Sequence, residues 1–235
     1  MINNRLNEST IGSAKVIVDI LPGGKVIPNV KMNPTSITVH QTGNVGAPAK
    51  NNHNYMKNCN KNGNRIASWH FTVGYDYIYQ AQSTNYKCYH AGTTAGNNTS
   101  IGVEICMYSD KEKQIQAYKN AIELGKILMG YHKFSINQVK RHKDFSGKHC
   151  PAWLIEGKYG YTWSWFKEQL SVKPSQPTVQ PTPQPSTEVG VPFLATIIVD
   201  ELNIRKDADF NSEVVGVVKK GGVYTITEVK NGLGK

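Results

Sequence analysis

The sequence has few acidic residues for its number of basic ones. Lysine and arginine total 27, aspartate and glutamate 17, and the formal net charge of the 235-residue chain is +10 at pH 7. Residues 1–170 hold all of the excess, with 20 basic and 10 acidic side chains. Such a region attracts polyanions. Nucleic acid, an anionic membrane and the anionic polymers of a bacterial wall all fit this charge, and so does a basic surface that only confers solubility.

Long apolar runs are also missing. No stretch reaches the roughly 18 consecutive apolar residues of a membrane span, so we expect no membrane insertion. The segment Met1–Glu8 is polar and lacks the apolar region of a secretory signal. We therefore expect synthesis in the cytoplasm without a signal peptide, and release by another route if the protein acts outside the cell.

Cysteine is scarce, and no Cys-x-x-Cys pair occurs, which excludes a zinc ribbon. The four cysteines are at positions 59, 88, 106 and 150. A chain of this size does not need disulfides, and a reducing compartment disfavours them. We expect Cys59, Cys88 and Cys106 to be buried free thiols. Cys150 differs because it lies in a histidine-containing segment.

Proline is concentrated in residues 171–190, which read SVKPSQPTVQPTPQPSTEVG and contain five prolines. This composition is typical of an extended linker of polyproline character. It predicts a domain at residues 1–170 and a smaller one at 191–235. Two domains joined in this way can reach different points of one large target.

Predicted strands and helices alternate within residues 1–170. Alternating or continuous apolar residues predict strands over Ser36–His40, Ala67–Val73, Tyr77–Gln80, Ser100–Met107 and Ile136–His142. Apolar residues at helical spacing predict helices over Ala47–Cys59, Lys111–His132 and Thr162–Leu170. Interleaved strands and helices predict an α/β fold, with a mixed β-sheet flanked by helices.

The last 45 residues show a different pattern. Short β-type runs occur at Phe193–Val199, Leu202–Arg205, Val214–Val218 and Val223–Val229. Polar residues and glycines separate them. Short strands at close spacing predict a small all-β barrel.

Two histidines and one cysteine form a candidate metal site. His40 ends the strand ITVHQT and points away from the face of Val39, while His142 and Cys150 flank a glycine-containing loop in RHKDFSGKHCP. Catalytic zinc uses three protein ligands and leaves a fourth position open. Spacing alone leaves the alternative of two ordinary histidines and a buried thiol, because ligands this far apart are a weaker signal than a compact motif.

Glu104 interrupts the apolar strand SIGVEICM. A carboxylate in a central strand is unfavourable unless it is paired or used. It is either the partner of a lysine or arginine in the core, or a general base beside a metal centre. Lys148, two residues before Cys150, is either a plain surface lysine or within reach of the same centre, where it would stabilise an oxyanion.

Five segments carry a family resemblance. ITVHQT, SWHFTVGYDYIYQ, YHAG, NTSIGVEIC and RHKDFSGKHCP occur in this order. Together they closely resemble the type-2 N-acetylmuramoyl-L-alanine amidases, the family of phage endolysins, bacterial autolysins and animal peptidoglycan-recognition proteins. The likeness covers about residues 30–170 and is strongest to amidases of Bacillus phages and prophages. It implies the fold of that family, a mixed sheet flanked by helices.

The resemblance also implies roles for individual residues. It places the ligands of one zinc ion per chain at His40, His142 and Cys150. It places the strand glutamate of the family at Glu104 and the lysine of its K-x-C-P motif at Lys148, both as catalytic residues.

Four further positions follow from the same resemblance. His70 in SWHF and His90 in YHAG match histidines that line the site in relatives, which implies substrate binding or tuning of the metal's surroundings. Trp69 stands where many relatives carry a tyrosine that assists catalysis, so this departure shifts weight onto Glu104. His149 is a rival ligand by composition, but the family pattern makes it an exposed loop residue.

The segment LNIRKDADFNSEVVGVVKKGGVYTITEVKNG resembles the first strands of a bacterial SH3-like wall-binding domain. Such domains usually continue with further strands, often with a Gly-Trp pair. We therefore expect residues 191–235 to form a partial domain of marginal stability, with an unpaired edge at Gly234 and Lys235.

The implied function is zinc-dependent hydrolysis of the amide between the lactyl group of N-acetylmuramic acid and L-alanine in peptidoglycan. The expected protein is a monomer that acts at the bacterial cell wall on peptidoglycan and its anionic polymers. The missing signal peptide favours a phage or prophage lysin released through a holin over a secreted autolysin. One alternative is a non-catalytic peptidoglycan-binding protein, although the three ligand residues are all present. The other is a nucleic-acid-binding protein, but the sequence lacks any such motif.

Overall fold

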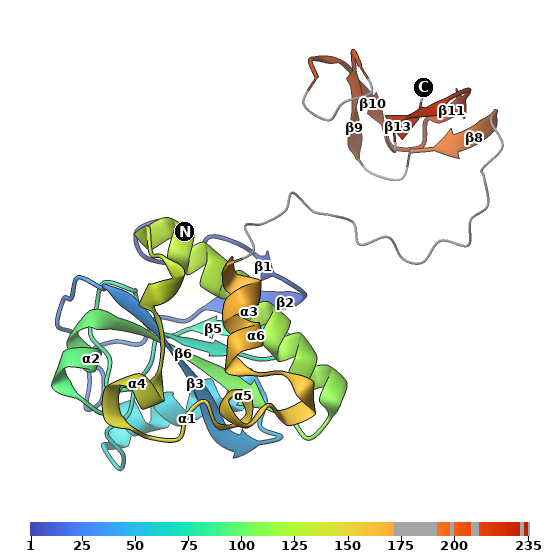
Figure 1. Ribbon diagram of the computed structural model, residues 1–235. Coiled ribbons are helices and arrows are strands. Elements are labelled where there is room, and N and C mark those ends of the chain that lie inside the picture. Colours follow the sequence, from blue (N-terminus) through green and yellow to red (C-terminus); the bar gives the residue numbers. More distant parts are fainter. Residues whose placement is uncertain (172–191, 198–199, 208–211, 231–232, 235) are drawn as a thin grey trace. The chain divides into compact units, whose positions relative to one another are not determined.

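The computed structural model describes residues 1–171, 192–197, 200–207, 212–230 and 233–234. Contacts divide the chain into two compact units, Met1–Gln176 and Pro177–Lys235 (Figure 1). Of the predicted linker, only Ser171 lies among the described residues, as the last residue of a helix. No helix in these described segments has the length and apolar character needed to span a membrane.

A seven-stranded mixed sheet forms the centre of the first unit. Its strands lie in the order β1-β2-β5-β4-β6-β3-β7. They are β1 (Thr10–Ile11), β2 (Ala14–Val18), β3 (Ser36–Val45), β4 (Phe71–Val73), β5 (Tyr77–Gln80), β6 (Ser100–Met107) and β7 (Val139–Arg141). The pairs β1–β2 and β4–β5 are antiparallel, and the other neighbours are parallel. The predicted mixed sheet is therefore confirmed.

The two longest strands of this sheet, β3 and β6, carry side chains on both faces. Ile37 and Val39 of β3 join the main hydrophobic cluster, whereas His40 points to the opposite face, as the period-two alternation predicts. Both strands are almost wholly buried in their parallel stretch. Burial on both faces is usual for parallel strands and explains the near-continuous apolar run of β6.

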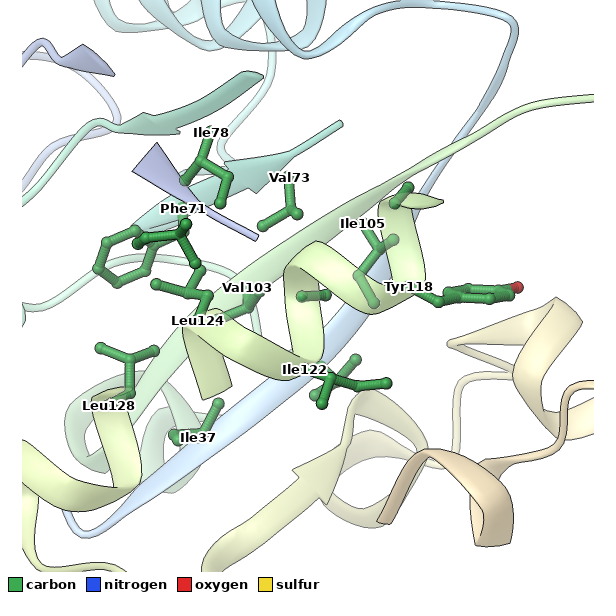
Figure 2. Packing of buried hydrophobic residues seen from close by; sticks show 14 of the residues in the cluster. Ile37, Phe71, Val73, Ile78, Val103, Ile105, Tyr118, Ile122, Leu124 and Leu128 are labelled. Carbon is green, nitrogen blue, oxygen red and sulfur yellow. The ribbon is translucent and has the colours of Figure 1, made fainter. Parts of the chain in front are cut away.

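Helix α3 (Lys111–His132) covers one face, and α6 (Trp163–Ser171) packs against it. The side chain of Asp110 caps the start of α3 by accepting a hydrogen bond from the backbone N–H of Lys113 at 3.0 Å. Tyr118, Leu124 and Leu128 are fully buried in the main cluster (Figure 2). Truncating Leu124 or Leu128 to alanine costs about 2–5 kcal/mol of stability. The packing of α3 therefore contributes substantially to the stability of the sheet.

Helix α1 (Ala49–Asn62) packs on β4 and β5 with a second, smaller cluster that includes Met56, Cys59 and Trp69. It ends at Gly63, whose left-handed φ of 74° is the usual helix stop that glycine adopts without strain. All four cysteines are free and buried, so the expectation for Cys59, Cys88 and Cys106 is confirmed.

Short helices appear where the sequence predicts loops or a strand. The predicted strand Ile136–His142 holds a 3-10 turn at Ile136–Gln138, because Ser135 and Gln138 form a capping box, and only Val139–Arg141 is a strand. The predicted loop before Cys150 contains α4 (His142–Ser146). The remaining short helices are α2 (Thr94–Thr99), α5 (Ala152–Glu156) and the 3-10 turn Lys158–Gly160.

The second unit consists of short antiparallel strands. They are β8 (Phe193–Thr196), β9 (Glu201–Arg205), β10 (Val214–Lys219), β11 (Val223–Ile226), β12 (Val229–Lys230) and β13 (Leu233–Gly234). They pair as β8–β11, β9–β10 and β12–β13. The described residues thus form three two-stranded sheets where a small barrel was predicted; Ile198, Val199 and Lys235 lie outside the described residues.

Candidate active site

Adjacent strands place His40 and Glu104 side by side. His40 on β3 and Glu104 on β6 are direct partners in the parallel register. Such partners lie about 4.8 Å apart and leave the sheet on the same face. Both side chains line a cavity of about 700 Å³ on the face opposite α3.

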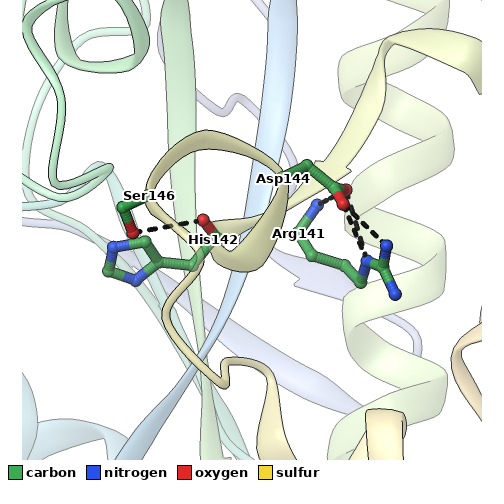
Figure 3. A network of polar contacts seen from close by, with 4 residues as sticks. All are labelled: Arg141, His142, Asp144 and Ser146. Carbon is green, nitrogen blue, oxygen red and sulfur yellow. Dashed lines mark hydrogen bonds and ion pairs between the residues drawn. The ribbon is translucent and has the colours of Figure 1, made fainter.

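His142 reaches this cavity from the first residue of α4. The Asp144 carboxylate accepts hydrogen bonds from the backbone N–H of Arg141 at 2.8 Å and from the Arg141 guanidinium at 2.7 Å. Figure 3 shows this pair on one side of α4 and the imidazole of His142 on the other. The pair anchors the start of the helix and so fixes the direction of the His142 ring.

Cys150 approaches the same point from the loop after α4. Its carbonyl accepts a hydrogen bond from the backbone N–H of Lys143 at 3.0 Å, and its Sγ accepts one from the backbone N–H of Gln41 at 3.5 Å. These two bonds tie the cysteine to α4 and to the residue that follows His40.

His40, His142 and Cys150 present three ligand atoms to one point. The Nδ1 atoms of His40 and His142 lie 3.0 Å apart, Cys150 Sγ lies 3.9 Å from His40 Nδ1, and all three ligand atoms lie within 4.8 Å of one another. Tetrahedral coordination at about 2.0–2.3 Å places ligand atoms roughly 3.3–3.7 Å apart. The observed separations bracket that range, so these buried side chains fit a small divalent cation.

The protonation of the three ligands also suits a cation. Burial lowers the pKa of His142 to about 4 and holds the pKa of His40 well below its usual range, so both rings are neutral near pH 7. Burial and then the charge of Glu104 raise the pKa of Cys150 to about 11. Metal binding needs neutral imidazole and a thiolate. A cation would supply the positive charge that this buried thiol lacks.

Glu104 has no ion pair with a lysine or arginine among the described residues, so the salt-bridge alternative finds no partner there. Its Oε2 is buried and has no hydrogen-bond partner within the same part of the chain. Burial raises the pKa of Glu104 to about 7, against smaller opposing effects of Lys148 and Arg65. A carboxylate with this pKa and a free oxygen is suited to accept a proton.

Lys148 is exposed and lines the cavity. Its positive charge contributes to lowering the pKa values of His40, His142 and Glu104. The lysine thus lies near the cluster of His40, His142 and Cys150.

Comparisons with known proteins agree with this geometry. Residues 30–153 match the family described as N-acetylmuramoyl-L-alanine amidase. The chain belongs to this amidase family. N-acetylmuramoyl-L-alanine amidase XlyA of Bacillus subtilis is 37% identical over 187 residues, which are 77% of this chain and 60% of XlyA. CwlH of the same organism is 37% identical over 155 residues, 64% of this chain and 58% of CwlH.

Solved structures give the same relationship. The catalytic domain of XlyA has a TM-score of 0.59 and 40% identity over 67% of this chain and 99% of that domain. PlyL has a TM-score of 0.57 and 30% identity over 67% of this chain and 96% of that structure. The chain thus contains an amidase fold, while it spans only about 60% of the length of full XlyA.

Two more histidines of this amidase-family site take different positions. His90 lines the cavity. His70 is fully buried, and both of its ring nitrogens bond to the backbone: Nδ1 accepts from Gly102 N–H at 2.9 Å, and Nε2 donates to the Tyr86 carbonyl at 2.8 Å. This geometry gives His70 a role in holding the backbone, and its contact with substrate stays a prediction.

His149 lies as the family pattern implies, and Trp69 is the departure from that pattern. His149 is exposed and pairs with Glu156 at 2.9 Å, outside the three-ligand cluster. Trp69 lines the cavity but is largely buried, and its Nε1 donates to Thr72 Oγ1 at 2.7 Å. The indole offers no ionisable hydroxyl at this position.

The sequence reasoning overlooked the outer part of the cavity. Arg65, Ile66 and Tyr55 line it and are exposed, with 72% of Ile66 accessible. The only sequence signal is that Arg65 and Ile66 directly precede the segment with Trp69 and His70. No motif or periodicity marks an arginine in a connecting segment, so only the fold shows that Arg65 lines the cavity.

Proposed function

We propose that the chain hydrolyses the amide between the lactyl group of N-acetylmuramic acid and L-alanine in peptidoglycan, with one zinc ion held by His40, His142 and Cys150. The observation that carries this proposal is the convergence of these three ligand atoms in a cavity that Glu104 also lines, in a chain of the amidase family. Among the described residues, Oε2 of Glu104 has no hydrogen-bond partner. Bound zinc would supply Lewis acidity, which polarises the amide carbonyl and acidifies the attacking water.

The residues of the chain then divide the proton and charge transfers. Glu104 accepts a proton from the attacking water and passes it to the nitrogen of the leaving L-alanine, so the C–N bond breaks without releasing an amide anion. Lys148 stabilises the negative charge that develops on the carbonyl oxygen. The volume of the cavity, about 700 Å³, supports a large substrate. Arg65 and Lys148 line the cavity, and their positive charges complement an anionic stem peptide.

Mass spectrometry of digested peptidoglycan tests this proposal. An amidase of this kind frees stem peptides with an amino-terminal L-alanine and leaves the glycan strands intact. Reducing sugar ends without free L-alanine amino groups would contradict it. Treatment with a chelator, followed by restoration with zinc alone, tests the metal on the same substrate.

We also propose a division of labour within the chain. Residues 1–170 would form the catalytic domain, 171–190 a proline-rich linker, and 191–235 a partial SH3-like domain that binds the bacterial wall and its anionic polymers. The separation into two units at Gln176 and Pro177 supports this boundary. A protein ending at Leu170 should hydrolyse soluble fragments at the rate of the full chain and bind intact walls more weakly. Loss of turnover on soluble fragments would contradict independent domains.

A further inference from the structure

A chain of hydrogen bonds leads from the candidate metal site into the sheet. His40 Nε2 lies 3.0 Å from His90 Nδ1, and His90 Nε2 lies 3.1 Å from the carbonyl oxygen of Ser100. The rings of His40 and His90 meet edge to face, with centroids 5.1 Å apart. The proposed function assigns no role to this chain of hydrogen bonds.

The carbonyl at the inner end decides where each proton lies. A carbonyl only accepts, so His90 Nε2 must carry a hydrogen and donate it to Ser100. His90 is buried and pairs with no carboxylate among the described residues, so its ring is neutral and its Nδ1 is an acceptor. His40 must then donate from Nε2, which leaves the lone pair of its Nδ1 directed at His142 and Cys150.

We propose that His90 is a positioning residue that selects the Nε2–H tautomer of His40 and so makes Nδ1 of His40 the metal-binding atom. This inference rests on the zinc site of the proposed function. Metal-ligating histidines commonly have their second nitrogen held by a carbonyl or carboxylate. Here the carbonyl of Ser100 fixes the position of the proton on His90, and His90 in turn fixes the position of the proton on His40.

The surroundings of His90 are built to hold its ring. A Cβ atom at Gly102 would lie 2.7 Å from Cγ of His90, so glycine at this point of β6 makes room for the imidazole. The side chain of Asn97 accepts hydrogen bonds from the backbone N–H groups of His90 and Ala91 at 2.9 and 2.7 Å. The backbone and the ring of His90 are thus both constrained.

Nitrogen-15 NMR of the metal-free protein tests the inference without any substitution. The histidine rings report which nitrogen carries the proton. We expect His40 and His90 to be protonated on Nε2. Protonation of His40 on Nδ1 would overturn the proposal, whether or not the protein later proves to bind zinc or cleave peptidoglycan.

Two substitutions at His90 extend the test to metal affinity. His90→Phe keeps a ring but offers His40 no acceptor, and we expect zinc affinity, measured by chelator competition, to fall about 10–100-fold. His90→Asn retains an acceptor oxygen near the place of Nδ1, and we expect it to recover most of that loss and the Nε2–H form of His40. His132→Asn is the matched control, because His132 bonds to Thr84 away from the cavity, and its zinc affinity should equal that of the unaltered protein.

Equal zinc affinity in His90→Phe and the unaltered protein would overturn the role of His90. A loss of affinity with an unchanged His40 tautomer would do the same, because it would show a general structural effect. If the unaltered protein binds no zinc at all, the proposed function fails, while the tautomer measurement still decides the inference about His90.

Discussion

The two candidate ligand histidines and their two histidine neighbours differ in what their ring nitrogens face. His40 and His142 turn their Nδ1 atoms toward each other and toward Cys150. Both ring nitrogens of His70 form hydrogen bonds with backbone groups. His90 forms one hydrogen bond with a backbone carbonyl and one with His40. All four are buried, so burial does not distinguish a ligand from a support. The distinction lies in which nitrogens the backbone has already used.

Removing a candidate ligand histidine should have the largest effect. His142→Ala deletes a ring whose Nδ1 faces His40, whereas His149→Ala deletes an exposed ring bonded to Glu156. We expect the first variant to lose bound zinc and wall lysis and the second to keep both, as measured by elemental analysis and turbidity of cell walls. The opposite pattern would show that the ligand assignment is wrong.

Replacing the candidate base should separate chemistry from metal binding. Glu104→Gln keeps the shape of the side chain but cannot accept the proton of water. We expect zinc content to persist and kcat to fall about 10²–10⁴-fold, the usual contribution of a positioned general base. Turnover near that of the unaltered protein would show that another group accepts the proton.

Lys148→Ala should have a somewhat smaller effect on the same readout. If this lysine stabilises the oxyanion, its removal costs about 2.7–4 kcal/mol of transition-state stabilisation while zinc remains bound. Lys143→Ala on α4 is a suitable control, because it removes an exposed cation nearby that does not line the cavity. An equal loss of kcat/KM in both variants would indicate a general effect of charge.

The stability of the metal-free protein should report the buried histidines as a group. Burial lowers the pKa values of His70 and His142 to about 4 and of His90 to about 3, from an ordinary value of 6.5. The unfolded chain then takes up protons that the folded chain excludes, so stability is full above about pH 6.5 and falls as the pH drops toward 4. Thermal denaturation with a chelator present, followed from pH 8 to pH 4, measures this decline.

Glu104 contributes with the opposite sign and offers a control. Its pKa is raised to about 7, so its protonated form favours the folded state at low pH, and that contribution is lost as the pH rises through 7. Glu104→Gln should therefore steepen the acid decline and stabilise the metal-free protein above pH 7. An unchanged profile would show that Glu104 titrates alike in both states.

The sequence predicted the regular elements better than the short ones. The predicted ranges of α3 and β6 agree with the structure because long apolar periodicity marks them. Helix α2 was not predicted, since TAGNNT has no apolar face and only Thr93 marks its start, by accepting from Gly96 N–H. Strands β1 and β2 were missed for a similar reason: the first has two residues, and Ile17 and Val18 of the second are exposed.

The candidate site was accessible to sequence reasoning only in part. The alternation of β3 predicted that His40 and Val39 face opposite ways, and the composition singled out Glu104. The residues alone made His40, His142 and Cys150 a candidate metal set but left an alternative open, because His40 is more than a hundred positions from the other two, and the family resemblance strengthened the metal interpretation. The chain of hydrogen bonds through His90, which sets the tautomer of His40, ends on the backbone carbonyl of Ser100. A sequence pattern does not show where a backbone carbonyl points.

The register between β3 and β6 has a consequence for engineering. The spacing of His40 and Glu104 is fixed by backbone hydrogen bonds between adjacent strands, so it does not depend on the packing of any side chain. The outer wall of the cavity, by contrast, includes Arg65 and Ile66 in a connection that is exposed. We therefore expect that replacing this short connection would change the outer wall of the cavity and leave the separation of His40 and Glu104 as the sheet sets it.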